Sequence, residues 1–393
     1  MAPPSANPEP GSFGPPHDRS RPAILFIIRT LQFGGAERQL AMLARGLHGR
    51  GHRVAVMVLY AGGPLAGELE RAEVPILDLG KRGRWHLAGP VLRSIRLARQ
   101  FRPTILHGYL PSGNAMALLL RRFLPDARVV WAIRSTMLDF SRYNRFIRAT
   151  YWIANRLARH VDLVISNSWA GLADHVAAGY PADRAVVIPN GIDLDRFTPA
   201  ATQRGRTRAS WGVAADAIVV GMVCRVDPMK DHPTFLRAMA RLVAEEPQLR
   251  AVCIGNGPGA YRAELEALTH ELGIGDRVRW LPAVVDVAGI YPALDVLCSA
   301  SAFGEGFSNV LGEALASGVP CVATDVGDAA RILGDVGRIV PPRNPEALAL
   351  ALREAIAARS PALSARCRAR VADCFGTERL LDATERALGL KHA

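Results

Sequence analysis

The chain alternates short, continuous apolar runs with longer segments whose apolar residues recur every three or four positions. Continuous runs of this kind are typical of strands buried on both faces of a parallel sheet, and the longer period is typical of amphipathic helices. In the first half, the predicted strands are 23–28, 54–59, 76–79, 104–107, 128–133, 162–166 and 186–188. The predicted helices between them are 36–50, 87–101, 112–124 and 143–160.

The same alternation starts again after a turn rich in Pro, Asn and Gly. The second set of predicted strands is 217–224, 251–254, 277–281, 295–299, 319–324 and 338–340, followed by a helical tail at 361–393. Repeated strand–helix units predict an α/β protein with two doubly wound, Rossmann-like parallel sheets. We expect a disordered tail at 1–21, a first domain at 22–192, a second at 193–372, and a C-terminal helix at 373–393 that crosses back to the first domain.

Length and composition support this division. The chain has 393 residues, of which 49% are hydrophobic and 21% charged, as in a globular protein large enough for two domains. Residues 1–21 are rich in Pro, Gly and Ser and have no apolar core of a signal peptide, and no apolar run reaches the roughly twenty residues that span a bilayer. The six cysteines form no Cys-x-x-Cys motif, which indicates core residues in a reducing compartment. We therefore expect a cytoplasmic protein, with peripheral contact at the inner face of the membrane left open.

The charge of the chain favours anionic partners. The formal net charge is +12 and the sequence pI is about 10.0. Six arginines between Arg134 and Arg159 are interleaved with aromatic residues, a pattern that suits an anionic membrane surface or an anionic acceptor. A solvated helix face backed by core aromatics explains the same pattern. Nucleic acid is not expected as a partner, because no known nucleic-acid-binding module is visible.

Two carboxylates mark the loop and helix after the predicted strand 295–299. Glu305 falls in the loop, and Glu313 falls in the second turn of the helix that follows. The backbone N–H groups of Asn309, Val310 and Leu311 lack helical partners at that helix start and attract an anion. This arrangement suggests recognition of two polyols, a sugar and a ribose, beside a phosphate. An ordinary loop acid and a solvated helix residue would give the same spacing.

Two cations follow the first strand of the second half. Arg225 and Lys230 lie five positions apart, just beyond the predicted strand 217–224. An Arg with bidentate donors and a Lys with a compact charge, at the carboxyl end of a strand, are suited to clamping a diphosphate. A solvated basic turn is the alternative interpretation.

The first domain offers two further candidates. Gly34 and Gly35 form a turn between the first strand and its helix, and they would let a phosphate approach the backbone closely. The turn is not Gly-x-Gly-x-x-Gly, so the nicotinamide fingerprint is absent, and a plain tight turn remains an alternative. His107 ends a predicted strand and so falls at the ligand crevice of such a sheet, although a structural histidine fits equally well.

Together, these motifs resemble the retaining nucleotide-sugar glycosyltransferases of family four, whose two Rossmann-like domains form the GT-B fold and face each other across a cleft. The resemblance covers nearly all of residues 23–353. The motifs that carry it are Gly34-Gly35-Ala36-Glu37, Val187 to Asp193, Arg225 with Lys230, Gly255-Asn256-Gly257-Pro258, Glu305 to Glu313, and Gly318 to Gly327.

The resemblance implies roles at the donor phosphates. Gly35 would approach the donor diphosphate, and Arg225 with Lys230 would neutralise the diphosphate leaving group. The amides of residues 309–311 would hold phosphate. The resemblance implies no metal and no other cofactor.

It also implies how the sugars are held. Glu305 would bond hydroxyls of the transferred sugar, and Glu313 would bind the ribose. Tyr109 and Arg134 depart from the family pattern, since many relatives have histidine at these positions. Both departures bear on the acceptor or sugar side.

The function implied is that of a retaining, metal-independent hexosyltransferase. It would move a sugar from a nucleoside diphosphate sugar to a glycan or lipid-linked acceptor, in cell-envelope, lipopolysaccharide or exported polysaccharide biosynthesis. A nucleotide-sugar epimerase or a phosphorylase on the same fold is one alternative, and a non-catalytic sugar-nucleotide-binding protein is another.

Overall fold

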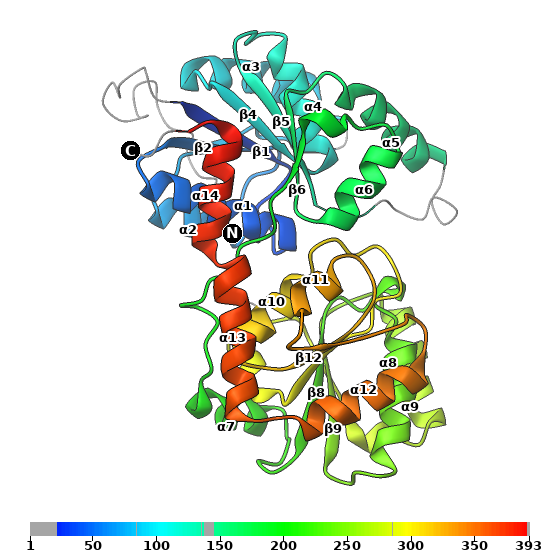
Figure 1. Ribbon diagram of the computed structural model, residues 1–393. Helices are drawn as coiled ribbons and strands as arrows, with labels where there is room; N and C mark the ends of the chain where they lie inside the picture. The colour runs from blue at the N-terminus through cyan, green and yellow to red at the C-terminus, as the bar shows by residue number, and fades with distance from the viewer. Residues whose placement is uncertain (1–21, 84, 135, 137–144, 285, 391–393) are drawn as a thin grey trace. The chain divides into compact units, whose positions relative to one another are not determined.

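The computed structural model describes residues 22–390 apart from 84, 135, 137–144 and 285. The predicted N-terminal tail, 1–21, lies outside the described residues. The chain divides into two compact units (Figure 1). Unit 1 comprises the chain up to Pro189 together with residues from Leu380 onward, and unit 2 comprises Asn190–Arg379.

Unit 1 is built on a seven-stranded parallel sheet with the order β3-β2-β1-β4-β5-β6-β7. The strands are β1 (Ala23–Ile28), β2 (Arg53–Val58), β3 (Ile76–Asp78), β4 (Ile105–Tyr109), β5 (Arg128–Ile133), β6 (Leu163–Ser166) and β7 (Ala185–Val187). All six residues of β1 are buried, because helices cover both faces of the sheet at its centre (Figure 1). The chain runs outward from β1 to β3 and returns to β4 on the other side of β1, so a topological switch point lies between β1 and β4.

Among its described residues, unit 1 contains the four predicted helices and two that were not predicted. The predicted helices are α1 (Gly35–Gly49), α3 (Ala88–Phe101), α4 (Leu110–Arg121) and α5 (Arg145–Ala158). The other two are α2 (Ala66–Arg71) and α6 (Trp169–Ala177), and a 3-10 turn η2 lies at Ala182–Arg184. The helix α4 lies directly on the sheet. A side chain at Gly113 would come within 2.1 Å of the Ile27 carbonyl oxygen, so this close approach requires glycine.

The C-terminal helix α14 (Thr377–Leu388) packs on unit 1 through its residues from Leu380 onward. It lies beside α1 (Figure 1), where a side chain at Gly46 would meet Leu381 at 2.6 Å. The carboxylate of Glu385 is buried and accepts from Arg50 at 2.6 Å and lies 2.8 Å from Nε2 of His52. Apolar packing and a buried charged contact therefore hold the end of the chain on the first sheet.

Unit 2 repeats the architecture with a six-stranded parallel sheet in the order β10-β9-β8-β11-β12-β13. Its strands are β8 (Ile218–Val223), β9 (Leu249–Ile254), β10 (Val278–Leu281), β11 (Val296–Ser299), β12 (Cys321–Thr324) and β13 (Arg338–Val340). Its helices are α7 (Ala201–Ser210), α8 (His232–Val243), α9 (Gly259–Glu271), α10 (Asn309–Ala316), α11 (Ala329–Leu333), α12 (Pro345–Ala357) and α13 (Pro361–Phe375), and its 3-10 turns are η3 (Pro228–Lys230), η4 (Gly275–Arg277) and η5 (Tyr291–Ala293). The predicted fold class, two doubly wound parallel sheets, is confirmed.

A buried ion network anchors α7 to this second sheet. Arg208 is buried, donates to Asp295 at 2.6 Å, and also donates to the carbonyl oxygens of Ala293 and Ala217. Asp295 accepts from Val219 N–H at 2.7 Å as well. Burial alone would raise the pKa of Asp295, but these donors and the neighbouring arginines outweigh it and hold that pKa below the ordinary value. The network therefore contributes to stability only while Asp295 is ionised.

One strand runs further than the sequence pattern predicted. The sequence places the end of the fourth strand at His107, but β4 continues to Tyr109, so His107 is the third of its five residues. The extension follows from pairing, because His107, Gly108 and Tyr109 all have partners on β5. Among the described residues, no helix is long and apolar enough to cross a membrane.

Candidate functional site

The candidate site in unit 2 lies at the carboxyl edge of its sheet. The chain runs outward from β8 to β10 and returns to β11 on the other side of β8, which makes a topological switch point between β8 and β11. Ligands of open α/β sheets bind in the crevice at such a point. The loops that follow β8 and β11 carry the predicted residues Arg225, Lys230 and Glu305.

Lys230 and Glu305 form an ion pair across this switch point. Both side chains are largely buried, with 14% and 13% of their surface exposed, and Ser301 donates a second hydrogen bond to Glu305 at 2.7 Å. Burial raises the pKa of Glu305, but the charge and hydrogen bond of Lys230 and the Ser301 hydroxyl outweigh it and lower that pKa overall. Glu305 is therefore an anion at neutral pH, and both of its carboxylate oxygens can act as hydrogen-bond acceptors.

Arg225 lies in the same loop but in a different environment. Its side chain is 70% exposed, and it makes a long ion-pair contact of 3.4 Å with Asp227. Asp227 is engaged by accepting from the Met229 N–H at 2.9 Å. The structure thus joins Lys230 to Glu305 and leaves the guanidinium of Arg225 in solvent at the same edge.

Glycines allow the loops at this edge to pack on one another. A side chain at Gly327, where φ is +62°, would come within 2.3 Å of the Glu305 carbonyl oxygen. A side chain at Gly255, where φ is +155°, would come within 1.8 Å of the Cys224 carbonyl oxygen. Both positions need glycine for conformation and for space, so these two motifs fix the loops that hold Glu305 and Arg225.

The helix α10 begins next to Glu305, as predicted. Its N-cap Ser308 makes no capping hydrogen bond through its side chain to any described residue. Asn309, its first residue, accepts through Oδ1 from Asn190 at 2.7 Å, while Val310 is half-buried and Leu311 buried. A helix start attracts anions through its free N–H groups, and binding of a phosphate at this one stays a prediction.

Glu313, in the second turn of α10, is more enclosed than its spacing suggested. Its carboxylate is buried and accepts from the Tyr291 hydroxyl at 2.5 Å. Tyr291 comes from η5, before β11, so sequence spacing could not have predicted this contact. The tyrosine orients the carboxylate, and the second oxygen of a carboxylate has further acceptor capacity.

His232, the first residue of α8, is a further group at this sheet edge that the sequence pattern did not indicate. It is buried, its Nε2 lies 3.8 Å from Sγ of Cys224, and its ring stacks on Trp280 at 5.8 Å. Burial, reinforced by the charge of Lys230, lowers the pKa of His232 to about 4, so the ring is neutral at physiological pH. The only signal in the sequence was its position directly after Lys230 and Asp231.

In unit 1, Gly34 and Gly35 lie where β1 leads into α1. Gly34 is the N-cap of α1, and a side chain there would collide with the carboxylate of Glu37 at 2.1 Å. The pKa of Glu37 is raised overall, because the effect of burial outweighs a hydrogen bond from its own backbone N–H that lowers the pKa. The turn is therefore open at the exposed Gly35 and covered by Glu37 at Gly34.

His107 is fully buried between Phe26 and Tyr109, with ring centroids 5.1 and 5.0 Å away. Neither ring nitrogen has a hydrogen-bond partner among the described residues. Burial, and after it the charge of Arg134, holds the pKa of His107 well below its ordinary value, so the ring is neutral.

Tyr109 and Arg134, the two residues that depart from the family pattern, contact each other. Arg134, just after β5, donates to the Tyr109 hydroxyl at 2.5 Å, and its guanidinium lies 4.4 Å from the centre of the Tyr109 ring. This pair puts a cation at the carboxyl edge of the first sheet. Residues 137–144 of the basic-aromatic segment lie outside the described residues. Among the described residues, no group of three or more His, Cys, Asp or Glu side chains is placed to hold a metal ion.

Two protein families match the chain, one for each unit. Residues 33–196 match the family described as Glycosyltransferase Family 4, and residues 217–358 match the family described as Glycosyl transferases group 1. The fold and the matches define the class as glycosyltransferase. The chain belongs to the family-four type with a GT-B fold, as the resemblance in sequence indicated.

Similar proteins agree with this placement. The chain is 39% identical over 241 residues to a D-inositol 3-phosphate glycosyltransferase of Geodermatophilus obscurus, covering 58% of this chain and 52% of that protein. It is 38% identical over 240 residues to the protein of the same name in Streptomyces avermitilis, covering 57% and 50%. The chain thus spans about half the length of the curated relatives that it matches.

Solved structures show the same fold. Anabaena HepE, solved in complex with UDP-glucose, superposes with a TM-score of 0.82, covering 93% of this chain and 99% of that one at 23% identity. A sucrose-phosphate synthase from Thermosynechococcus elongatus gives a TM-score of 0.76 at 22% identity, covering 94% and 98%. Identities this low establish the fold alone.

Proposed function

We propose that this protein transfers a sugar from a nucleoside diphosphate sugar to an acceptor, with retention of the anomeric configuration. The observation that carries the proposal is the arrangement at the switch point of unit 2. There an ion pair of Lys230 and Glu305, an exposed Arg225 and the start of α10 share one sheet edge. A diphosphate and a sugar need these groups: cations for the phosphates, a carboxylate for hydroxyls, and free N–H groups for an anion.

The donor would be held by its two ends. Arg225 and the α10 amides of residues 309–311 bind the diphosphate, and Glu313, oriented by Tyr291, binds the ribose. Gly35 of unit 1 lets a phosphate approach the backbone closely. Anabaena HepE is solved with UDP and with UDP-glucose, which makes a uridine donor the first to test.

The chemistry follows from where charge develops. As the bond from the anomeric carbon to the phosphate oxygen loosens, negative charge grows on the diphosphate, and Arg225 and Lys230 stabilise it more than they stabilise the ground state. The acceptor oxygen bonds to the anomeric carbon from the face that the diphosphate leaves, which retains configuration. The proton of the acceptor hydroxyl passes to the leaving phosphate oxygen. Glu305 holds the hydroxyls of the sugar that is transferred.

The acceptor would be anionic and at a membrane. Between residues 79 and 161, the sequence has sixteen Lys and Arg residues and two acidic residues, although the whole chain has a net charge of +12. This segment lies within unit 1 and therefore makes it the basic half of the protein.

Exposed apolar side chains gather on the same unit. Of the large apolar side chains exposed among the described residues, nine lie in unit 1 and two in unit 2. Trp85 and Leu92 are 83% and 69% exposed, beside the basic residues Arg82 and Arg96. Apolar residues flanked by arginines suit the surface of an anionic bilayer. We therefore propose peripheral binding at the inner face of the membrane and a lipid-linked acceptor in cell-envelope or exported polysaccharide synthesis.

A second candidate acceptor comes from the relatives. Both relatives described above are named for inositol 3-phosphate, a phosphorylated cyclic polyol. Arg134 would suit its phosphate as well as it suits a lipid phosphate.

The experiment is a transfer assay with UDP-sugars labelled in the sugar. Each donor is incubated with inositol 3-phosphate, with a polyprenyl-phosphate-linked sugar, or with no acceptor, and products are separated and their anomeric configuration is read by NMR. We expect label to move only when an acceptor is present and the configuration to be retained. Isomerised donor formed without any acceptor would instead show an epimerase, and binding of donor with no transfer to any acceptor would show a non-catalytic protein.

A further inference from the structure

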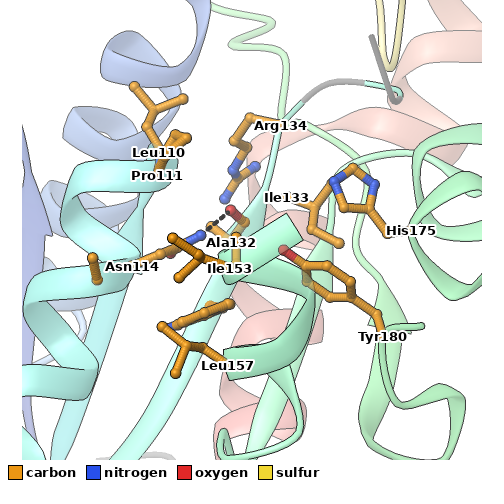
Figure 2. A pocket seen from close by; sticks show the side chains of 13 residues that line it. Leu110, Pro111, Asn114, Ala132, Ile133, Arg134, Ile153, Leu157, His175 and Tyr180 are labelled. Carbon is orange, nitrogen blue, oxygen red and sulfur yellow. Dashed lines mark hydrogen bonds between the residues drawn. The ribbon is translucent and has the colours of Figure 1, made fainter. Parts of the chain in front are cut away.

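A cavity of about 310 Å³ opens in unit 1, close to Arg134 (Figure 2). Its walls come from the start of α4, the end of β5, the second half of α5, and the segment of α6 and Tyr180 that follows β6. The side chains that line it are Leu110, Pro111, Asn114, Ala115, Trp131, Ala132, Ile133, Arg134, Ile153, Ala154, Leu157, His175 and Tyr180. An apolar cavity of about 150 Å³ holds one benzene molecule, so this one has room for a longer hydrocarbon.

Most of the wall is apolar. Ile133 from β5 and Leu157 from α5 face the cavity, and Ile153 stands at its side with half of its surface exposed (Figure 2). Removing such side chains from water is worth about 25 cal/mol for each Å² of apolar surface that a ligand covers. The walls therefore favour an apolar occupant.

Asn114 and Trp131, on the wall, each have a buried polar atom with no hydrogen-bond partner among the described residues. The Asn114 amide donates through Nδ2 to the Ala132 carbonyl at 3.3 Å (Figure 2), which fixes the orientation of the amide and leaves Oδ1 buried with no hydrogen-bond partner among the described residues. Trp131 is 2% exposed, and its Nε1 likewise has none. Each unmet group costs about 1–3 kcal/mol. Both atoms are buried beneath the apolar surface of the wall, so an occupant meets apolar side chains here and its polar partner at Arg134.

The charge of the wall has one sign. Arg134 is the only Lys or Arg among the described residues that line the cavity. None of the described lining residues is an Asp or Glu. His175 donates through Nδ1 to the Gly171 carbonyl at 2.7 Å, and burial lowers the pKa of His175, so the ring is neutral at pH 7. Tyr109, which does not line the cavity, accepts a hydrogen bond from Arg134 and stacks against its guanidinium. The wall therefore suits an anionic group at one place only.

We propose that this cavity holds the apolar part of an amphipathic phosphate, with its phosphate bound by Arg134, and that the acceptor of this enzyme is accordingly a lipid phosphate or a sugar linked to one. The inference rests on the proposed function and narrows its acceptor. Inositol 3-phosphate has an anionic group for Arg134 but no apolar part for the cavity.

The test uses n-decyl phosphate below its micelle concentration, titrated into the full-length protein by calorimetry. We expect saturable binding at one site, with n-decanol and inorganic phosphate each at least tenfold weaker, because each lacks one half of the interaction. Equal affinity for decyl phosphate and inorganic phosphate would overturn the proposal.

Two test variants and one control variant locate the binding. Ala154→Phe fills the cavity from α5 and should weaken decyl phosphate at least tenfold. Ala173→Phe adds the same ring on the exposed side of α6, outside the cavity lining, and should change nothing. Arg134→Gln should weaken decyl phosphate and leave decanol unchanged. Undiminished binding of decyl phosphate to Ala154→Phe, with its circular dichroism and melting temperature as in wild type, would place the ligand elsewhere and overturn the proposal.

The same samples are titrated with UDP, so that two failures can be told apart. Binding of UDP without binding of decyl phosphate would overturn the cavity proposal and leave the transferase proposal standing. If the wild type binds decyl phosphate but does not bind UDP, the result would count against the donor site and not against the cavity. If Ala154→Phe loses decyl phosphate, it should keep the affinity of the wild type for UDP, since UDP is assigned to unit 2.

Discussion

Lys230 and Glu305, seventy-five positions apart in the chain, form a largely buried ion pair at the switch point of the second sheet. Removing one partner of a buried pair leaves the other charge uncompensated, which typically costs about 3–5 kcal/mol. We expect Lys230→Met to lower the free energy of unfolding by about 3 kcal/mol, near the low end of that range, because both side chains keep some exposure. Urea unfolding at pH 7 measures the change.

The control for this prediction is Arg225→Met in the same loop. Its side chain is exposed, so the free energy of unfolding should stay within about 0.5 kcal/mol of wild type. A double variant of Lys230→Met and Glu305→Gln should recover part of the loss, because no charge is left unpaired. Additive losses in the double variant would mean that the two residues do not interact.

The pair also gives the protein an acid dependence. Because the folded-state pKa of Glu305 lies below its unfolded value of about 4.3, its contribution to stability is complete above that pH and is lost as the pH falls through the folded pKa. We expect the stability of wild type minus that of Glu305→Gln, measured by urea unfolding, to shrink as the pH falls below about 4.3. A difference that does not vary with pH would contradict this assignment.

Asp295 should be the most sensitive charged position for the stability of unit 2. It is paired with buried Arg208 and bonded to the Val219 N–H, so Asp295→Asn leaves the Arg208 charge uncompensated. We expect a loss of about 3–5 kcal/mol in urea unfolding. Asp286→Asn is the matched control, since Asp286 is exposed and contacts Arg196 at 3.3 Å, and it should change stability by less than about 0.5 kcal/mol. Equal effects of the two variants would count against the buried network.

Membrane binding should depend on unit 1. Leu92→Glu places a negative charge on an exposed apolar position of α3 beside Arg96, and should reduce sedimentation with vesicles of phosphatidylcholine and 30% phosphatidylglycerol by about tenfold. The control is Leu350→Glu, the same change at an exposed leucine of α12 in unit 2, and it should leave sedimentation unchanged. The surface is misassigned if the two variants behave alike.

Tyr109 should act as a positioning residue for Arg134. Tyr109→Phe keeps the ring under the guanidinium but removes the hydroxyl that accepts from it. Losing one such bond to a charged group costs about 1.5–3 kcal/mol at most, so we expect KM for an anionic acceptor to rise about tenfold while kcat and the Kd of UDP stay near wild type. A fall in kcat at unchanged KM would instead place Tyr109 in the chemical step.

Much of the fold could be predicted because its signals are local. The strand β1 is a continuous apolar run, and its predicted bounds, 23–28, are those of the structure. The end of β4 could not be found this way, because Gly108 and Tyr109 join the strand through pairing with β5 and not through their own apolar pattern. His107 was therefore expected at a crevice and lies in the core instead.

The candidate site, like the fold, has features that the sequence predicted and features that it could not predict. Arg225, Lys230 and Glu305 were found because each follows a strand closely, and the parallel sheet brings such ends to one edge. That Lys230 bonds to Glu305 while Arg225 stays exposed depends on side-chain packing, which spacing does not encode. The cavity beside Arg134 could not be predicted at all, since its walls come from four separate elements.

The most direct test of diphosphate binding by unit 2 is a comparison of the affinities of UDP and uridine. Calorimetry measures both affinities for wild type and for Arg225→Ala. A charged contact of about 1.5–3 kcal/mol corresponds to roughly 10- to 100-fold in affinity. We predict that wild type binds UDP far more tightly than uridine, and that Arg225→Ala weakens UDP at least tenfold while leaving uridine unchanged. Equal affinities of wild type for UDP and uridine, or an Arg225→Ala variant that binds UDP as wild type does, would contradict the account.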